Sequence, residues 1–111
     1  MKTSEKIRSK QYTPEEEAFL FWGKLVSLNN RHPNITLFKD SYKIGRDPSN
    51  DIVIDDPRIS QFHCVLTKQP DHQILLEDKS SNGVFFKKKK IGKENVKVVQ
   101  HSETFYLLHP S

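Results

Sequence analysis

The chain has few of the features that would place it outside a reducing compartment. It contains a single cysteine, Cys64, so no internal disulfide can form, and one unpaired thiol suits a reducing environment. No segment approaches the ~18 consecutive apolar residues that a membrane-spanning helix requires. The N-terminus also lacks the apolar stretch of a signal peptide. We therefore expect a nuclear or, as the alternative, a cytoplasmic protein, with no membrane partner.

The chain also lacks the residue combinations that carry out catalysis or hold a metal. No assembled catalytic site is visible, and the cysteine and the histidines show no metal-ligand spacing. These histidines are His32, His63, His72, His101 and His109. We therefore expect no catalytic residue, no metal and no cofactor in this segment.

The length and composition fit one small domain. A chain of 111 residues buries a single core. Only 34% of its residues are hydrophobic and the mean hydropathy is −0.70, so the core must be thin and the surface polar.

Positive charge is concentrated in two segments. The net charge is +4, yet residues 87–97 carry six lysines against Glu94 alone, and residues 1–10 add a further excess. Such runs bind nucleic-acid phosphates or act as nuclear localisation signals. A lysine run at a hairpin tip is more often a solvated face, which makes nucleic acid an improbable partner.

Residues 1–20 are predicted to form a flexible basic tail, and residues 21–111 the folded domain. Within the tail, Thr13 followed by Pro14 and three glutamates has the pattern of a helix start. This short helix would span two turns at most before Gly23, or the segment would fray directly into a strand.

From Phe21 onward, short alternating segments separated by turn residues predict a series of strands. Their lengths and close spacing are typical of an all-β antiparallel sandwich of about ten to eleven strands. The recognisable segments are Trp22–Leu28, Ile35–Phe38, Tyr42–Gly45, Asp51–Ile54, Phe62–Lys68, Gln73–Glu77, Val84–Phe86, Val96–Val99 and Thr104–Leu108.

Three fragments at strand ends carry small or forked hydrogen-bond donors: Gly45-Arg46, Ser60-x-x-His63 and Ser81-Asn82-Gly83. A phosphothreonine carries ~−1.5 to −2 charge and three acceptor oxygens. A fixed guanidinium such as that of Arg46 suits it, and hydroxyl and backbone N–H groups add donors. The amide of Asn82 has both a donor and an acceptor, which suits an extended peptide.

Each fragment taken alone has an ordinary structural explanation. Gly-Arg is common at strand ends, Asn82-Gly83 is a standard type I′ turn signal, and Ser60 would satisfy loop backbone. His63 lies in an alternating segment, where a structural histidine is more common than a ligand. The order and spacing of the three fragments together are the stronger signal.

In these fragments the chain resembles the forkhead-associated (FHA) domain, a phosphothreonine-peptide-binding β-sandwich. The resemblance covers about residues 21–109 and rests on Gly45-Arg46, Ser60-Gln61-Phe62-His63 and residues 78–83. Residues 21–25 also resemble the first strand of FHA domains from checkpoint and meiotic serine/threonine protein kinases. The resemblance implies a non-catalytic regulatory domain of such a kinase, whose kinase domain would lie beyond residue 111.

The resemblance also implies a role for each site residue. Arg46 and Ser60 would contact the phosphate, Asn82 would hold the peptide backbone, and Ser81 occupies a position that also contacts phosphate in some members. Arg58 stands where some members carry an arginine that selects an acid three residues after the phosphothreonine. The residues that would shape the loops are Gly45, His63 and Gly83.

The chain departs from the family pattern in three places. Phe62 replaces a common basic residue before the histidine, and Val84 replaces the usual threonine after Asn-Gly. Family domains normally add a strand after the one matching Thr104–Leu108, whereas this sequence ends at Ser111. We expect the resulting open edge to favour pairing with another chain.

Two further hypotheses follow, one from the N-terminal tail and one from the lysine run. Thr13 has Glu16 three residues later, so a phosphorylated Thr13 would suit the preference assigned to Arg58 and would link two copies; alternatively Thr13 is only a helix N-cap. The runner-up function is nucleic-acid binding through Lys87–Lys90, Lys93 and Lys97. That strip lacks the interleaved aromatics that stack on single strands.

Overall fold

The computed structural model describes residues 21–29 and 31–109. The predicted tail, with Thr13 and its helix start, lies outside the described residues. The described part contains nine strands and no helix, and therefore no helix that would cross a membrane. It falls into two units that divide between Lys39 and Asp40.

The first unit is a two-stranded antiparallel hairpin of β1 (Gly23–Leu25) and β2 (Ile35–Leu37). β1 is shorter than the predicted segment Trp22–Leu28. After Val26 the chain leaves the ladder, because the Ser27 N–H donates to the Asn34 side chain at 3.0 Å instead of to a strand partner. This bond closes the loop between the two strands.

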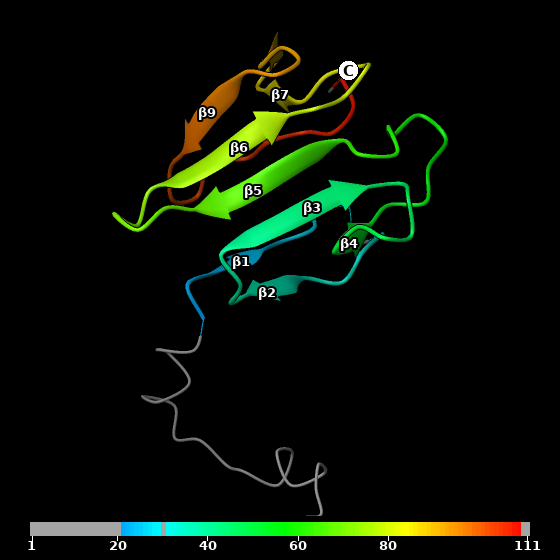
Figure 1. Ribbon diagram of the computed structural model, residues 1–111. Helices are drawn as coiled ribbons and strands as arrows, with labels where there is room; N and C mark the ends of the chain where they lie inside the picture. Colours follow the sequence, from blue (N-terminus) through cyan, green and yellow to red (C-terminus); the bar gives the residue numbers. More distant parts are fainter. Residues whose placement is uncertain (1–20, 30, 110–111) are drawn as a thin grey trace, which may run out of the picture. The chain divides into compact units, whose positions relative to one another are not determined.

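The second unit contains a five-stranded sheet with the order β4-β3-β5-β6-β9 (Figure 1). All neighbours in this sheet are antiparallel except β3 and β4, which are parallel. The predicted antiparallel sandwich thus contains one parallel pair. The strands are β3 (Ser41–Gly45), β4 (Ile52–Val53), β5 (Cys64–Lys68), β6 (Ile74–Asp78) and β9 (Val96–Val99).

The buried face of this sheet follows from strand alternation. Tyr42 pairs with Leu66, which pairs in turn with Leu76, and all three side chains are buried. Two residues further along β6, the buried Asp78 lies opposite Cys64 of β5. The row of buried apolar side chains thus ends at a carboxylate, which accepts hydrogen bonds from the loop that follows β6.

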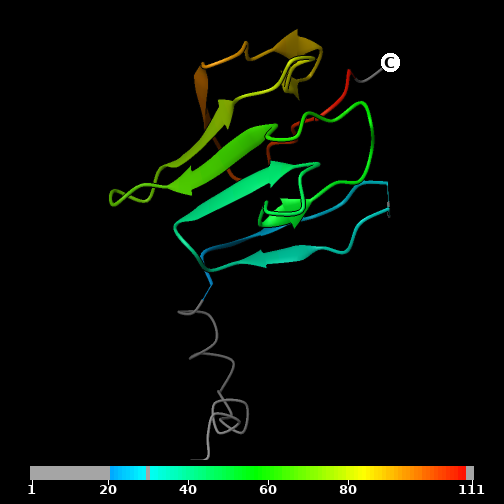
Figure 2. The same ribbon diagram turned by 45° about the vertical axis from the view of Figure 1, so that its right-hand side comes forward.

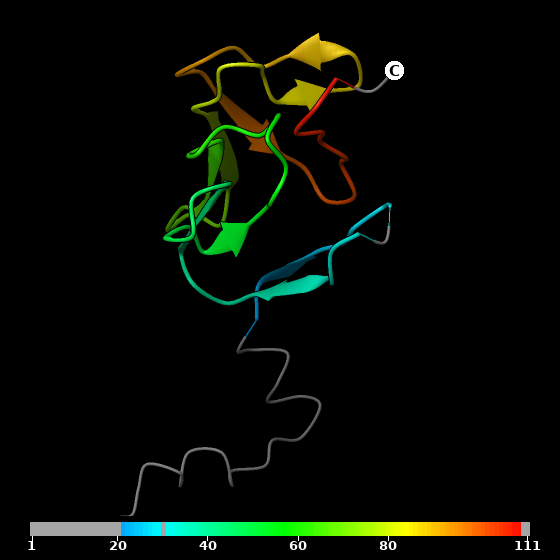
Figure 3. The ribbon, with the colours of Figure 1, turned by 90° about the vertical axis from the view of Figure 1, so that its right-hand side faces the viewer.

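A hairpin of β7 (Phe85–Phe86) and β8 (Lys89–Lys90) forms a separate two-stranded sheet. β8 was not predicted, because four successive lysines show no apolar alternation. Lys87, in the turn, has a φ of 58°. In Figure 3 the C-terminal segment runs beside this hairpin.

The C-terminal segment shows where the strand prediction is wrong. Instead of a strand over Thr104–Leu108, only Tyr106 forms an isolated bridge, to Phe85. Ring contacts of Phe105 with Phe86 and of His109 with Phe85 accompany this bridge. The nine described strands therefore fall one short of the lower predicted number.

Candidate functional site

Three loops meet at one end of the five-stranded sheet, where β3 and β6 end and β5 begins (Figure 2). Main-chain hydrogen bonds join them in pairs. The Arg46 N–H donates to Ser60 O at 3.0 Å, the Asp47 N–H to Gln61 O at 3.1 Å, and the Lys79 N–H to His63 O at 2.9 Å. The predicted fragments are thereby brought together on a framework of backbone bonds.

Gly45 allows the loop after β3 and the loop before β5 to approach closely. A Cβ at this position would lie 2.3 Å from the Gln61 carbonyl oxygen, well inside contact distance. The buried Asn50 side chain bridges the same two loops, since its Nδ2 donates to Asp47 O at 2.8 Å and to Gln61 O at 2.7 Å. Sequence reasoning missed Asn50, although its place in Asp47-Pro48-Ser49-Asn50 is a turn signal.

The guanidinium of Arg46 is fixed at one edge and open at the other. Its Nε donates to the Ile59 carbonyl at 3.0 Å. Among the described residues no ion pair neutralises it and no hydrogen bond uses its terminal N–H groups. An arginine held this way keeps a forked donor pair for an anion.

Ser60 connects Arg46 with the loop that follows β6. Its carbonyl accepts the Arg46 N–H, and its hydroxyl oxygen accepts the Ser81 N–H at 3.0 Å. The hydroxyl proton is then left to donate outward. Ser60 and Ser81 are thus held in contact beside Arg46.

His63 is fully buried and links two of the loops through its ring. Nδ1 accepts the Ser60 N–H at 3.0 Å, so Nε2 carries the proton and donates to Gly83 O at 3.1 Å. Burial lowers the pKa of this imidazole from its ordinary value, against the opposing effect of the Gly83 hydrogen bond and the Asp78 charge. His63 is therefore the neutral tautomer, and Gly83 beside it has a φ of 110°.

Asp78 and Ser80 build the loop that presents Ser81 and Asn82. The Asp78 carboxylate accepts the Ser80 N–H at 2.8 Å, the Ser80 hydroxyl at 2.6 Å and the Val84 N–H at 3.1 Å. The Ser80 hydroxyl oxygen then accepts the Gly83 N–H at 2.7 Å. Neither residue was predicted as part of the site, although Asp followed by Ser two residues later is an Asx-turn pattern.

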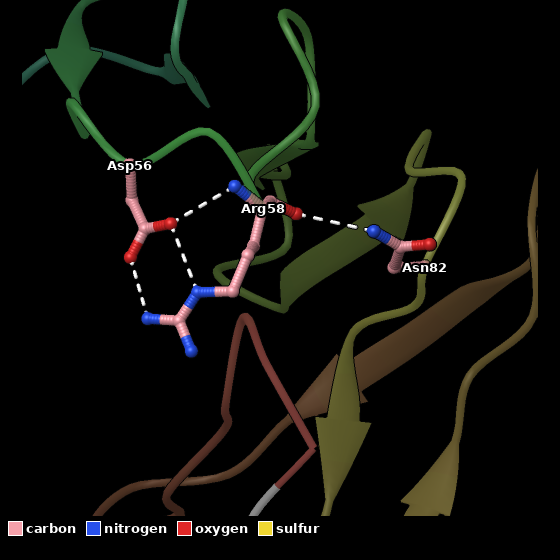
Figure 4. A network of polar contacts seen from close by, with 3 residues as sticks. All are labelled: Asp56, Arg58 and Asn82. Atoms are coloured by element: carbon pink, nitrogen blue, oxygen red, sulfur yellow. Dashed lines mark hydrogen bonds and ion pairs between the residues drawn. The ribbon is translucent and has the colours of Figure 1, made fainter.

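Asn82 and Arg58 meet at the outer rim of the site (Figure 4). The Asn82 amide donates to the main-chain carbonyl of Arg58 at 3.2 Å, while its oxygen points away from Arg58. The Arg58 side chain is paired with Asp56, at 3.0 Å from Nε to Oδ1 and 2.7 Å from Nη2 to Oδ2. Arg58, Ser81 and Asn82 are all solvent-exposed.

The remaining predicted positions lie around this group. Val84 is fully buried, and its main-chain N–H donates to the Asp78 carboxylate. Phe62 is half-exposed and lines an open hollow with Lys43, Val65, Lys79, Lys93 and Glu94. No cluster of histidine, cysteine and acidic side chains among the described residues is arranged to hold a metal.

Comparison with known protein families settles which family carries this arrangement. Residues 42–107 match the FHA domain. The chain belongs to the FHA domain family. FHA domains are non-catalytic binding domains, and the match covers all the site residues described above.

The curated relatives are larger signalling proteins. They include the probable serine/threonine-protein kinase fhkC of Dictyostelium discoideum, 34% identical over 65% of this chain and 13% of the relative. The E3 ubiquitin-protein ligase CHFR of Mus musculus is 32% identical over 79% of this chain and 14% of the relative. The chain thus spans only a small fraction of the length of these relatives.

Solved FHA domains share the fold. The N-terminal FHA domain of S. cerevisiae Rad53p, solved with a phosphothreonine peptide, matches with a TM-score of 0.70 at 20% identity, covering 74% of this chain and 77% of that one. The FHA domain of CT664 from Chlamydia trachomatis matches with a TM-score of 0.63 at 30% identity, covering 76% and 84%. The predicted all-β sandwich class is confirmed.

Proposed function

We propose that this FHA domain binds phosphothreonine peptides, with Arg46, Ser60 and Ser81 around the phosphate and Asn82 on the peptide backbone. The observation that carries the proposal is the hydrogen-bonded group of Arg46, Ser60 and Ser81. In this group the unpaired edge of the Arg46 guanidinium lies beside the Ser60 hydroxyl, whose proton is available to donate a hydrogen bond. The phosphothreonine peptide in the Rad53p structure supports this choice of ligand.

A second part of the proposal concerns peptide selectivity and biological setting. Arg58 would read an acidic residue at the third position after the phosphothreonine, because its side chain is exposed and its main-chain carbonyl accepts the Asn82 amide. We further propose that it is the regulatory domain of a nuclear checkpoint or meiotic protein kinase. The serine/threonine-protein kinases among the relatives support the kinase part of this proposal. CHFR shows that the same domain also occurs in a ubiquitin ligase.

The test compares one threonine peptide in phosphorylated and unphosphorylated form by isothermal titration calorimetry. The intact chain should bind only the phosphorylated form. Arg46→Ala should weaken binding by about tenfold to a hundredfold, because a hydrogen bond to a charged group is worth about 1.5–3 kcal/mol. Arg31→Ala, which removes an exposed charge in the other unit, is the matched control and should bind as the intact chain does.

Equal affinity for the two peptide forms, or undiminished binding by Arg46→Ala, would contradict the proposal. Nucleic-acid binding is then the alternative, recognised by a steep loss of DNA affinity with salt. The structure weakens that alternative at Lys97. This side chain pairs with Glu103 at 3.0 Å and lies 4.3 Å above the Phe86 ring, so it is not an unpaired member of the lysine strip.

We also propose that a phosphorylated Thr13 of one copy occupies the site of another. Thr13 lies outside the described residues, so this proposal rests on the sequence Thr13-Pro14-Glu15-Glu16 and on the site. Glu16 is the third residue after Thr13, the position assigned to Arg58. An alternative consistent with the sequence is that Thr13 acts only as a helix N-cap.

A further inference from the structure

The side chain proposed to select an acidic peptide residue already has an acidic partner within the same loop. Asp56 Oδ1 and Oδ2 accept from Nε and Nη2 of Arg58, at 3.0 and 2.7 Å. The contact is a two-point pairing of carboxylate and guanidinium, the geometry that an acidic peptide side chain would itself use. The Arg58 guanidinium is therefore already paired with a carboxylate of its own chain.

Asp56 is held in place more firmly than Arg58. Its Oδ1 also accepts the main-chain N–H of Arg58 at 2.9 Å, and its main-chain carbonyl accepts the Ile59 N–H at 2.9 Å. The Asp56 side chain is 24% exposed, against 64% for that of Arg58. The carboxylate is thus tied into the turn by main-chain hydrogen bonds, and the guanidinium paired with it is the more exposed partner.

The pairing leaves one edge of the guanidinium available. Arginine has five N–H donors, and Asp56 takes one from Nε and one from Nη2. In Figure 4 the third nitrogen points away from Asp56, and no hydrogen bond among the described residues uses it. An incoming carboxylate must either take this edge, close to the negative charge of Asp56, or displace Asp56.

We propose that Asp56 is a built-in competitor that limits the preference of this domain for acidic residues in the phosphopeptide. The inference rests on the proposed function, since it concerns the same peptide site. Specificity is a difference between two affinities. Asp56 lowers the affinity for an acidic peptide through like-charge repulsion or the loss of its own pairing, whereas a neutral peptide meets neither cost.

Asp56→Asn is the direct test. Asparagine keeps an oxygen for the Arg58 N–H and is a good Asx-turn former, so the turn is retained. The charge next to the guanidinium is removed. The ratio of affinities for acidic and neutral phosphopeptides should rise by about two- to fivefold, the size of an exposed charge interaction. Asp55→Asn removes the same charge from the exposed neighbouring residue and should leave the ratio unchanged.

The peptides are a phosphothreonine series in which a single aspartate is moved through the four positions after the phosphothreonine, with an all-alanine reference. Calorimetry gives each affinity for the intact chain, Asp56→Asn, Asp55→Asn, Arg58→Ala and the double variant that combines Asp56→Asn with Arg58→Ala. Asp56→Asn should have no effect on the ratio once Arg58 is alanine. An unchanged or lowered ratio in Asp56→Asn alone would overturn the role of Asp56.

The same series separates this inference from the proposed function. Failure of the alanine phosphopeptide to bind the intact chain contradicts phosphothreonine binding itself, whatever Asp56 does. A second measurement uses the intact chain alone, so it does not depend on the variant folding. The Arg58 Nε–H resonance should move when the acidic phosphopeptide is added and not with the neutral one. A resonance that moves equally with both peptides would contradict competition at the guanidinium.

Discussion

At the scale of single residues, the site depends on groups that hold loops together as much as on groups that face solvent. Arg46, Ser60 and Asn82 were predicted as candidates from their side-chain chemistry, and the structure places them on loops at one end of the sheet. Asn50 was not, since its partner Gln61 belongs to a loop that it meets only in the folded chain. Asp56 and Asp78 were not predicted as site residues either, although each accepts a backbone N–H two residues further along its own turn. Local turn signals marked their positions but not their roles.

His63 gives the residue-scale prediction. Its pKa is lowered from 6.5 by burial, so below about pH 6.5 the unfolded chain binds a proton that the folded chain resists. Because the unfolded state then binds more protons, the free energy of unfolding should fall as the pH drops from 6.5 to 5.5, by at most about 1.4 kcal/mol per pH unit. Urea unfolding at a series of pH values measures this slope.

Two variants assign the slope to His63. Replacing the exposed His101 by glutamine should leave the pH dependence as it is. A folded His63→Gln variant should lose the acid-dependent decrease over this interval. Stability that is constant or increases between pH 6.5 and 5.5 in the intact chain would show that the imidazole is not held neutral.

At the scale of elements, strands were predicted correctly where apolar and polar residues alternate strongly. They were missed where the strand consists of charged residues. β3, β5 and β6 alternate clearly and were found within one or two residues of their ends. β8 consists of lysines and gave no signal, although its ladder with β7 forms all the same. In β9, Val96 and Val98 are exposed while Lys97 lies over Phe86, so apolar identity alone did not reveal which face is inward.

The β7–β8 turn carries the element-scale prediction. Lys87 has a φ of 58°, in the left-handed region that a non-glycine residue adopts at a cost. Lys87→Gly should therefore raise the free energy of unfolding by about 0.5–1 kcal/mol. Lys88→Gly removes the same charge from the next residue, which is not at positive φ, and should lower it by a similar amount.

Chemical denaturation of the two variants in parallel checks the hairpin geometry. Both variants lose one lysine from the same run, so relief of repulsion within the run is common to them. Lys87→Gly also removes the attraction between Lys87 and Glu103, which works against the expected gain. Lys87→Gly no more stable than Lys88→Gly would mean that the left-handed residue has been placed wrongly in the turn.

At the scale of the whole molecule, the uneven charge is partly resolved by the fold. Lys87–Lys90 are exposed on the β7–β8 hairpin. Lys97 is paired with Glu103, and Lys79 with Glu77 and Glu94. The sequence-level excess therefore overstates the continuous basic surface available to a nucleic acid. The unpaired guanidinium edge of Arg46 is a small site by comparison, suited to one phosphate.

The whole-molecule prediction concerns two copies of the chain. A chain phosphorylated at Thr13 should form dimers that dissociate on dilution, because each copy would offer one phosphothreonine and one site. Two reciprocal contacts raise the effective affinity above that of a single contact. Light scattering across a concentration series measures the mass. The unphosphorylated chain and the phosphorylated Arg46→Ala chain should both remain monomers.

A mixture of two chains, one with only the phosphothreonine and the other with only the intact site, shows whether the two parts bind between copies. Phosphorylated Arg46→Ala offers a phosphothreonine but lacks the guanidinium to bind one, and the unphosphorylated intact chain has the reverse combination. Together they should form a one-to-one complex, weaker than the reciprocal dimer because only one contact remains. Binding within a single chain would leave this mixture monomeric, since neither chain contains both parts. A monomeric mixture combined with a monomeric phosphorylated intact chain would contradict self-association. It would favour the alternative hypothesis, that Thr13 acts only as a helix N-cap.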